Sequence, residues 1–167
     1  MSAPASPGSE AKNIAIRFAQ PGDVESLARL INRAFVVERP FIAGERIDPP
    51  GVGVFMERGR LLVAEDADGL AGCVYVELRG ERGYLGLLGV EPRRQGTGLG
   101  RKLMEAAEKY FRAANCRAID LRIISPREPL ARFYAHLGYT ETGTAPFAPD
   151  VPLKVPCHYI LMSKSLV

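Results

Sequence analysis

The sequence lacks several features that would place it in a specialised class of protein. No apolar run approaches the ~18 residues of a membrane-spanning helix, so we expect no membrane partner. No long run of basic residues occurs and the net charge is only +3, so we expect no nucleic-acid partner. Residues 1–13 are rich in Ser, Ala, Pro and Gly without the apolar core of a signal peptide, and we expect a disordered N-terminal tail there.

Cysteine is scarce as well. The three cysteines, Cys73, Cys116 and Cys157, are an odd number and show no metal-ligand spacing, so we expect no metal site. Cys73 falls within a strand pattern, where a small core residue is a more common role than a nucleophile. Because thiols stay reduced in the cytoplasm, we expect a cytoplasmic protein.

What is present is the composition of an ordinary globular protein. The chain has 167 residues, of which 47% are hydrophobic and 25% are charged. That length is enough to bury one substantial core. We therefore expect a single domain over residues 14–167.

The most informative segment is a glycine-rich turn between a predicted strand and a predicted helix. Residues 84–90 are apolar and strand-like, and from Leu99 onward apolar residues recur at helical spacing. Gly96, Gly98 and Gly100 lie at this junction. A helix start offers unpaired backbone N–H groups and the positive end of the helix dipole, and glycines let an anion approach them closely. The turn therefore favours a phosphate-binding site.

The spacing of this turn excludes two common phosphate-binding loops. A P-loop ends in Gly-Lys-Ser/Thr, but Gly100 is followed by Arg101 and no hydroxyl follows Lys102. A dinucleotide-binding fingerprint needs one residue more between its last two glycines. Residues 95–100, Gln-Gly-Thr-Gly-Leu-Gly, instead resemble the acyl-CoA loop of the Gcn5-related N-acetyltransferases, the GNAT family, whose pattern is Gln/Arg-x-x-Gly-x-Gly/Ala. A glycine-rich turn with no ligand at all is the alternative.

The resemblance to this family covers residues 14–165. Residues 14–23 resemble its first strand and helix start, and residues 61–65 and 71–78 resemble its second and third strands. Residues 130–139 resemble its late helix, whose common form is Phe/Leu-Tyr-x-x-x-Gly-Phe/Tyr. The resemblance implies the α/β GNAT fold, a mixed and mostly antiparallel sheet of about seven strands with about four helices. The sheet would be splayed centrally, after the glycine-bearing strand, to admit acetyl-CoA.

Hydrophobic periodicity predicts the remaining elements. A stripe from Val24 to Phe35 at helical spacing, capped by Asp23, predicts a first helix, and a short second helix is expected near residues 52–58. A long helix begins near Leu99. Further strands are expected at residues 84–90, 117–124, 139–144 and 157–164.

The resemblance assigns the cosubstrate acetyl-CoA to the glycine-rich turn and to the strand before it. It implies that the pyrophosphate lies on the N–H groups of residues 96–101 and that the strand backbone pairs with the pantetheine arm. The implied binding residues are Leu88, Gly89, Val90, Gln95, Gly96, Thr97, Gly98, Leu99, Gly100 and Arg101. Gly86 and Gly89 also permit a plainer interpretation, because glycine inside a strand marks a bulge or a close approach.

One position departs from the family pattern. Many members carry Asn seven residues before the helix tyrosine, where it helps to hold the pantetheine arm. Arg127 stands at that place here. We assign Arg127 to cofactor binding as well, since a cation there could meet a phosphate instead.

Tyr134 is the catalytic candidate that the resemblance supplies. In the family a tyrosine at this place lies near the thioester sulfur. A phenol of pKa ~10 is protonated at neutral pH and can donate to the departing thiolate as a general acid. The alternative is a core role, since Tyr134 lies four residues after Leu130 on one face of its helix.

The general base is less well marked. Glu77 alternates with Tyr75 along its strand and could act through a water molecule, although a solvated strand-end carboxylate is the more common role. Glu81 lies nearby in a turn. His158 could titrate in the right range but is more commonly structural, and His136 is expected at the surface.

These assignments predict an N-acetyltransferase in which an amine attacks acetyl-CoA directly. The acceptor would be a small-molecule or peptide amine, bound by the least patterned segments, residues 36–60 and 143–157. Four prolines between Thr144 and Cys157 are expected to stiffen a wall over the acceptor, and the alternative is that this segment docks on the protein's own sheet or on a second subunit in a homodimer. A non-catalytic acyl-CoA-binding module is the rival function, and a nucleotide-binding domain is a weaker one.

Overall fold

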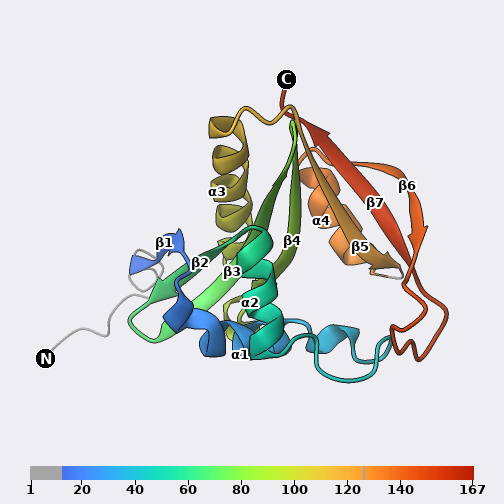
Figure 1. The fold of residues 1–167 in the computed structure, drawn as a ribbon, viewed down its shortest axis with the longest axis horizontal. Coiled ribbons are helices and arrows are strands. Elements are labelled where there is room, and N and C mark those ends of the chain that lie inside the picture. The colour runs from blue at the N-terminus through green and yellow to red at the C-terminus, as the bar shows by residue number, and fades with distance from the viewer. Residues whose placement is uncertain (1–12, 126) are drawn as a thin grey trace, which may run out of the picture.

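A computed structural model describes residues 13–125 and 127–167, so the expected tail lies outside the described residues apart from Asn13. Within them the chain forms a seven-stranded sheet with helices on both faces (Figure 1). The strand order is β1-β2-β3-β4-β5-β7-β6, and each neighbouring pair is antiparallel except β4 with β5. The strands are β1 (Ala15–Phe18), β2 (Arg60–Asp66), β3 (Gly69–Arg79), β4 (Arg82–Val90), β5 (Ala118–Ser125), β6 (Thr140–Pro146) and β7 (His158–Ser165). The helices are α1 (Val24–Ala34), α2 (Pro49–Arg58), α3 (Leu99–Ala113) and α4 (Glu128–His136).

The sheet carries an apolar core on each face. On one face α1 and α2 pack on β2, β3 and β4, around side chains such as Leu30 and Tyr75. On the other face α3 and α4 pack around side chains such as Phe111 and Val74. Because β2 and β3 are covered on both faces, their central residues are apolar at every position instead of alternating. The predicted mixed, mostly antiparallel α/β fold is confirmed.

The expected elements are present, with differences at their ends. α2 begins at Pro49 and not near residue 52, because the Asp48 side chain accepts a hydrogen bond from the Gly51 N–H at 2.7 Å. Two prolines are well tolerated in that first turn. α1 ends at Ala34, and a separate 3₁₀ turn over Val36–Glu38 follows it.

β4 and β5 pair over a short stretch only. Arg82, Gly83 and Tyr84 of β4 lie opposite Ala118, Ile119 and Asp120, and the pairing of these two strands includes no later residue. The Arg82 guanidinium binds the Asp120 carboxylate across this junction, with Nη2 to Oδ1 at 2.6 Å. Beyond it the two strands diverge, as Figure 1 shows. The predicted central splay is therefore present.

A bulge in β4 accompanies the divergence. Tyr75 of β3 lies opposite Gly86, whereas Cys73 lies opposite Gly89, so Leu87 and Leu88 share one position on the partner strand. Leu87 adopts a φ of +49°, which is uncommon for a residue with a side chain. A Cβ on Gly89 would lie 3.0 Å from the Cβ of Ala34. The bulge and the close packing that the glycines indicated are thus both found.

Past the bulge, β4 has an edge without a partner strand. The Glu91 N–H donates to the Ala71 carbonyl at 2.8 Å, on the β3 side. Because successive residues of a strand turn their N–H and C=O groups to opposite sides, those of Leu88 and Val90 face the gap beside β5. Consistent with this, the Gln95 side-chain amide donates to the Val90 carbonyl at 3.4 Å. Hydrogen-bonding groups are therefore exposed where the sheet opens.

The junction of β4, β5 and α3 allows a direct test of this packing. A Cβ on Gly83 would lie 2.4 Å from the fully buried ring of Phe111, so Gly83→Ala must displace the ring or the strand. We expect the free energy of unfolding in urea to fall by about 1–3 kcal/mol. Gly143→Ala in β6 is the matched control, because nothing lies within 4 Å of the added Cβ. Equal stability of the two variants would contradict the account of this junction.

Candidate active site

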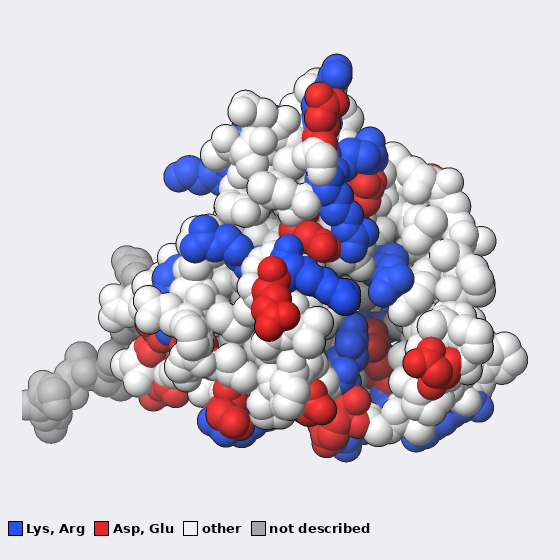
Figure 2. All heavy atoms as spheres, in the orientation of Figure 1, with Lys and Arg blue, Asp and Glu red and all other residues white. Residues whose placement is uncertain are grey.

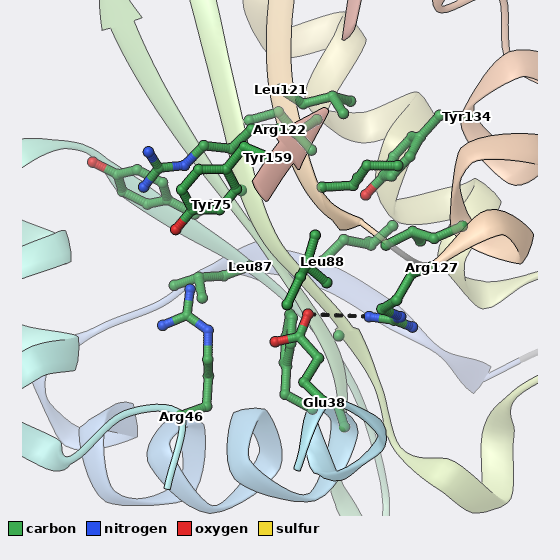
Figure 3. A pocket seen from close by; sticks show the side chains of 18 of the residues that line it. Glu38, Arg46, Tyr75, Leu87, Leu88, Leu121, Arg122, Arg127, Tyr134 and Tyr159 are labelled. Carbon is green, nitrogen blue, oxygen red and sulfur yellow. Dashed lines mark hydrogen bonds and ion pairs between the residues drawn. The ribbon is translucent and has the colours of Figure 1, made fainter. Parts of the chain in front are cut away.

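The gap between β4 and β5 continues into a cavity of about 1180 Å³. Its walls come from β4, the glycine-rich turn before α3, β5 and α4. The segment after α1 and the loop between β6 and β7 close it from the other side. Figure 3 looks into this cavity. The two poorly patterned segments and the glycine-rich turn, far apart in the sequence, therefore line one site.

The glycine-rich turn forms an open cradle at one end of the cavity. Gly96 and Gly98 adopt φ values of +80° and +84°, and nothing lies within 4 Å of a Cβ added to either. Gly98 directly precedes α3 and supplies no side chain to cap the helix. The first N–H groups of a 15-residue helix thus face open space at a site where the helix dipole is positive. An anion fits this cradle.

The predicted cofactor residues lie together at the cavity with one exception. Its lining includes Leu88, Gly89, Val90, Gln95, Gly96, Gly98, Leu99, Gly100, Arg101 and Arg127. Thr97 points elsewhere, because its hydroxyl donates to the Arg94 carbonyl at 2.5 Å. That bond closes the turn, so the Thr97 side chain shapes the cradle from outside.

Tyr134 lies in α4, where its ring belongs to the core and its hydroxyl borders the cavity. Its ring is 95% buried and packs edge-to-face against Phe133 and Tyr139, with ring centroids 5.2 and 5.8 Å away. Its hydroxyl points into the cavity (Figure 3). Burial raises the pKa of the phenol well above its usual value, although the positive charge of Arg127 lowers it in part. Tyr134 therefore presents a proton donor to the cavity at neutral pH.

Glu77 also lines the cavity, but its carboxylate forms an ion pair. Its carboxylate Oε2 lies 2.7 Å from Nη2 of Arg79, two residues along β3. Glu81 and His158 are absent from the lining, and His136 is exposed on α4 with Nδ1 2.8 Å from the Arg132 carbonyl. Among the candidate bases Glu77, Glu81 and His158 and the expected surface residue His136, only Glu77 lines the cavity.

Arg127 precedes α4 and carries a partner that the sequence did not indicate. Its Nη1 lies 3.3 Å from the Glu38 carboxylate Oε1, in the 3₁₀ turn after α1 (dashed line in Figure 3). Both side chains are largely buried. This ion pair joins the two walls of the cavity, so the charge at Arg127 is balanced within the protein.

The two segments of little sequence pattern pair with each other beside the cavity. The Ala43 N–H donates to the Pro152 carbonyl at 2.9 Å, and the Lys154 N–H donates to the Phe41 carbonyl at 2.7 Å. Phe147 of the second segment stacks on Tyr159 with ring centroids 4.0 Å apart. The proline-rich segment lines the cavity, and it also docks on the chain's own sheet at Tyr159 of β7 and on the α1–α2 connection.

No cysteine lines this cavity, and no described cluster of side chains there is arranged to bind a metal ion. Cys73 is fully buried, and burial raises the pKa of its thiol to about 12, so it carries no appreciable thiolate at neutral pH. Among the described residues, no group of three or more His, Cys, Asp or Glu side chains is arranged to hold a metal ion. The polar side chains that line the cavity include tyrosines, arginines and carboxylates.

The splayed sheet and the glycine cradle at its opening define a recognisable class of α/β protein. The profile of the acetyltransferase (GNAT) family matches residues 24–139. The chain belongs to this family, and the expectation drawn from residues 95–100 and 130–139 is confirmed.

Curated relatives cover part of the chain. The mycothiol acetyltransferase of Kineococcus radiotolerans is 36% identical over 84 residues, which are 50% of this chain and 27% of that protein. The mycothiol acetyltransferase of Actinosynnema mirum is 28% identical over 134 residues, 77% of this chain and 45% of the relative. The chain thus spans less than half the length of these relatives.

Solved structures share the fold over nearly the whole chain. Ard1 from Thermoplasma volcanium superposes with a TM-score of 0.77 at 19% identity, covering 93% of this chain and 99% of that one. The yncA structure from Salmonella typhimurium, solved with its cofactor acetyl-CoA, gives 0.74 at 22% identity, covering 93% and 95%. At such identities the likeness establishes the fold. No helix in the described part of the chain has the length and apolar character to cross a membrane.

Proposed function

We propose that this protein transfers the acetyl group of acetyl-CoA to an amine. The observation that carries the proposal is the pairing of two features in one cavity: the open N–H cradle at the start of α3 and the unpartnered edge of β4. The cradle suits a pyrophosphate, and the edge suits an amide-containing arm that pairs with it as a strand would. Membership in the acetyltransferase (GNAT) family supports the same assignment.

The proposed binding residues divide by their chemistry. The N–H groups of residues 96–101 would hold the pyrophosphate, with the glycines leaving room for close approach. Leu88 and Val90 would bind the amides of the pantetheine arm through their backbone, and Gly89 would keep α1 close behind the strand. Arg127 would act mainly through its ion pair with Glu38, by fixing the cavity walls.

The reaction proposed is a direct transfer without a covalent enzyme intermediate. The neutral amine attacks the thioester carbonyl, a C–N bond forms, and the C–S bond breaks with its electrons on sulfur. Tyr134, whose phenol is protonated at neutral pH, would donate its proton to the sulfur as general acid and would regain a proton from water. The proton lost by the amine would leave through water toward Glu77.

The rival proposal is a non-catalytic module that binds acyl-CoA. The Glu77–Arg79 ion pair favours it, since the carboxylate oxygen Oε2 of the candidate base is already held by a guanidinium. The rival keeps the cradle and dispenses with Tyr134 as an acid. The two proposals therefore agree on cofactor binding and differ on turnover.

Three further proposals concern the acceptor, the domain and the assembly. The acceptor would be a small-molecule or peptide amine, the domain would be single over residues 14–167, and the protein would be able to form a homodimer. A cytoplasmic location is likewise an expectation, based on the free thiols Cys73, Cys116 and Cys157.

Charge at the cradle tests the cofactor site. In Gly98→Asp, a carboxylate would stand where the pyrophosphate is proposed to bind, and we expect the Kd for CoA to rise about 10-fold or more. Gly98→Asn is the matched control, because its side chain has the same size and meets the same positive φ of +84° without charge. Isothermal titration calorimetry measures both. Equal affinity in the two variants would refute the proposed place of the pyrophosphate.

The phenol of Tyr134 tests the mechanism. Tyr134→Phe should keep the affinity for acetyl-CoA and lower kcat by about 10²–10⁴, the usual contribution of a positioned acid. Tyr139→Phe is the control, since the neighbouring Tyr139 hydroxyl is buried without a partner among the described residues and is not part of the cavity lining. Turnover of Tyr134→Phe equal to that of Tyr139→Phe would favour the non-catalytic rival or another acid.

A further inference from the structure

Besides Arg101 at the glycine-rich turn, three arginines from separate parts of the described chain line the cavity without a carboxylate partner. They are Arg46 in the α1–α2 connection, Arg58 at the end of α2 and Arg122 in β5. Among the described residues, none of the three forms an ion pair. In Figure 3, Arg46 rises into the cavity from the connection while Arg122 extends from the strand on the opposite side. Like charges converging on one hollow repel each other, so the arrangement favours an anion between them.

The carboxylates of the cavity are already engaged with other cations. Glu38 binds Arg127, Glu45 binds Arg39 at 3.2 Å, and Glu77 binds Arg79. Asp120 binds Arg82, and this ion pair holds the pKa of the Asp120 carboxyl below its usual range. The positive charge of the three unpartnered arginines is therefore not balanced by the acidic residues of the cavity wall.

Aromatic rings, not acids, support two of these guanidinium groups. The Arg122 Cζ lies 4.1 Å from the centroid of the Tyr159 ring, which Phe147 supports from the proline-rich segment at 4.0 Å. The Arg46 Cζ lies 5.5 Å from the centroid of the Phe35 ring. Cation–π contact engages the face of a guanidinium and leaves its N–H donors free for a planar oxoanion.

Two of the three arginines, Arg58 and Arg122, lie away from the cradle proposed for the cofactor phosphates, whereas Arg46 lies over Phe35, which packs beside Gly89. Gly59, next to Arg58, packs against Tyr75 and Val76, and Val76 pairs with Leu85 near the start of β4. Arg122 follows by two residues the Asp120 that pairs with Tyr84. The cradle begins beyond Val90, about five strand residues further, or roughly 15–20 Å. A phosphate on the cradle does not balance the charge at this end.

We infer that the acceptor is a small amine that also carries an oxoanion, a carboxylate or a phosphonate, bound by Arg46, Arg58 and Arg122. This inference rests on the proposed function and specifies its substrate class. The amine would face Tyr134 and the thioester while the acid group lies among the guanidinium groups. Each charge-assisted, two-point contact between guanidinium and oxoanion fixes orientation as well as affinity. Polycationic amines are disfavoured, because Lys and Arg side chains gather along the hollow between α2 and β7 (Figure 2).

Matched acceptors test this inference. We would measure kcat/KM by CoA release for L-amino acids against their carboxamides, for aminoalkylphosphonates against their diesters, and for spermidine. We expect each acid to exceed its neutral counterpart by about 10-fold or more, and Arg122→Gln to remove the difference without changing the affinity for acetyl-CoA. Comparison of kcat/KM between the carboxylate and the phosphonate acceptors identifies which oxoanion the site prefers. Arg29→Gln, on exposed α1 surface outside the cavity, is the control.

A binding measurement covers acceptors that do not turn over. With CoA saturating the protein, N-acetyl-L-alanine and N-acetylated aminomethylphosphonate should raise the melting temperature, whereas N-acetyl-L-alaninamide should not. The double variant Arg46→Gln/Arg122→Gln should lose that stabilisation and still bind CoA. Equal response to acid and amide in both measurements, or a preference for spermidine, would overturn the inference alone. Failure of the wild-type protein to bind CoA would instead overturn the proposed function.

Discussion

The candidate site depends on the place where β4 stops pairing with β5. Parallel pairing ends after Tyr84, and the bulge at Leu87 and Leu88 then bends β4 away, so that the strand keeps β3 on one side and faces open space on the other. An unpaired strand edge exposes N–H and C=O groups that need partners. α1 packs tightly behind Gly89, which holds the bent strand in place. The opening, the cradle at α3 and the buried face of α4 all follow from this divergence.

The cavity is rich in hydrogen-bond donors along its whole length. At one end the donors are the first N–H groups of α3, and at the other they are the unpartnered guanidinium groups, with the Tyr134 hydroxyl on α4 facing the same space. Its carboxylates are used to hold the walls, as Glu38 does with Arg127. Such a site suits a substrate pair with acceptor oxygens at both ends. It is also compatible with chemistry in which negative charge appears on sulfur.

The fold could be predicted because its strands and helices carry local signals. The apolar stripe in α1, the strand and helix patterns on either side of the glycine-rich turn, and the helix pattern ending at Gly138 each mark an element. These patterns place most elements within a few residues of their observed bounds. The sequence gives no such signal for the Glu38–Arg127 ion pair, which joins residues 89 positions apart. The convergence of arginines was missed for the same reason. They come from a connection, a helix end and a strand that only the tertiary fold brings to one cavity, and nothing in local spacing encodes that arrangement.

The most direct test of the central claim is residue-resolved amide hydrogen exchange with and without CoA. If CoA occupies the gap between β4 and β5, exchange should slow at Leu88 and Val90 and at the first N–H groups of α3, because these donors gain partners. Exchange at the already paired residues Arg82–Tyr84 should stay unchanged. Unaltered exchange at the β4 edge and at α3 in saturating CoA would contradict the account.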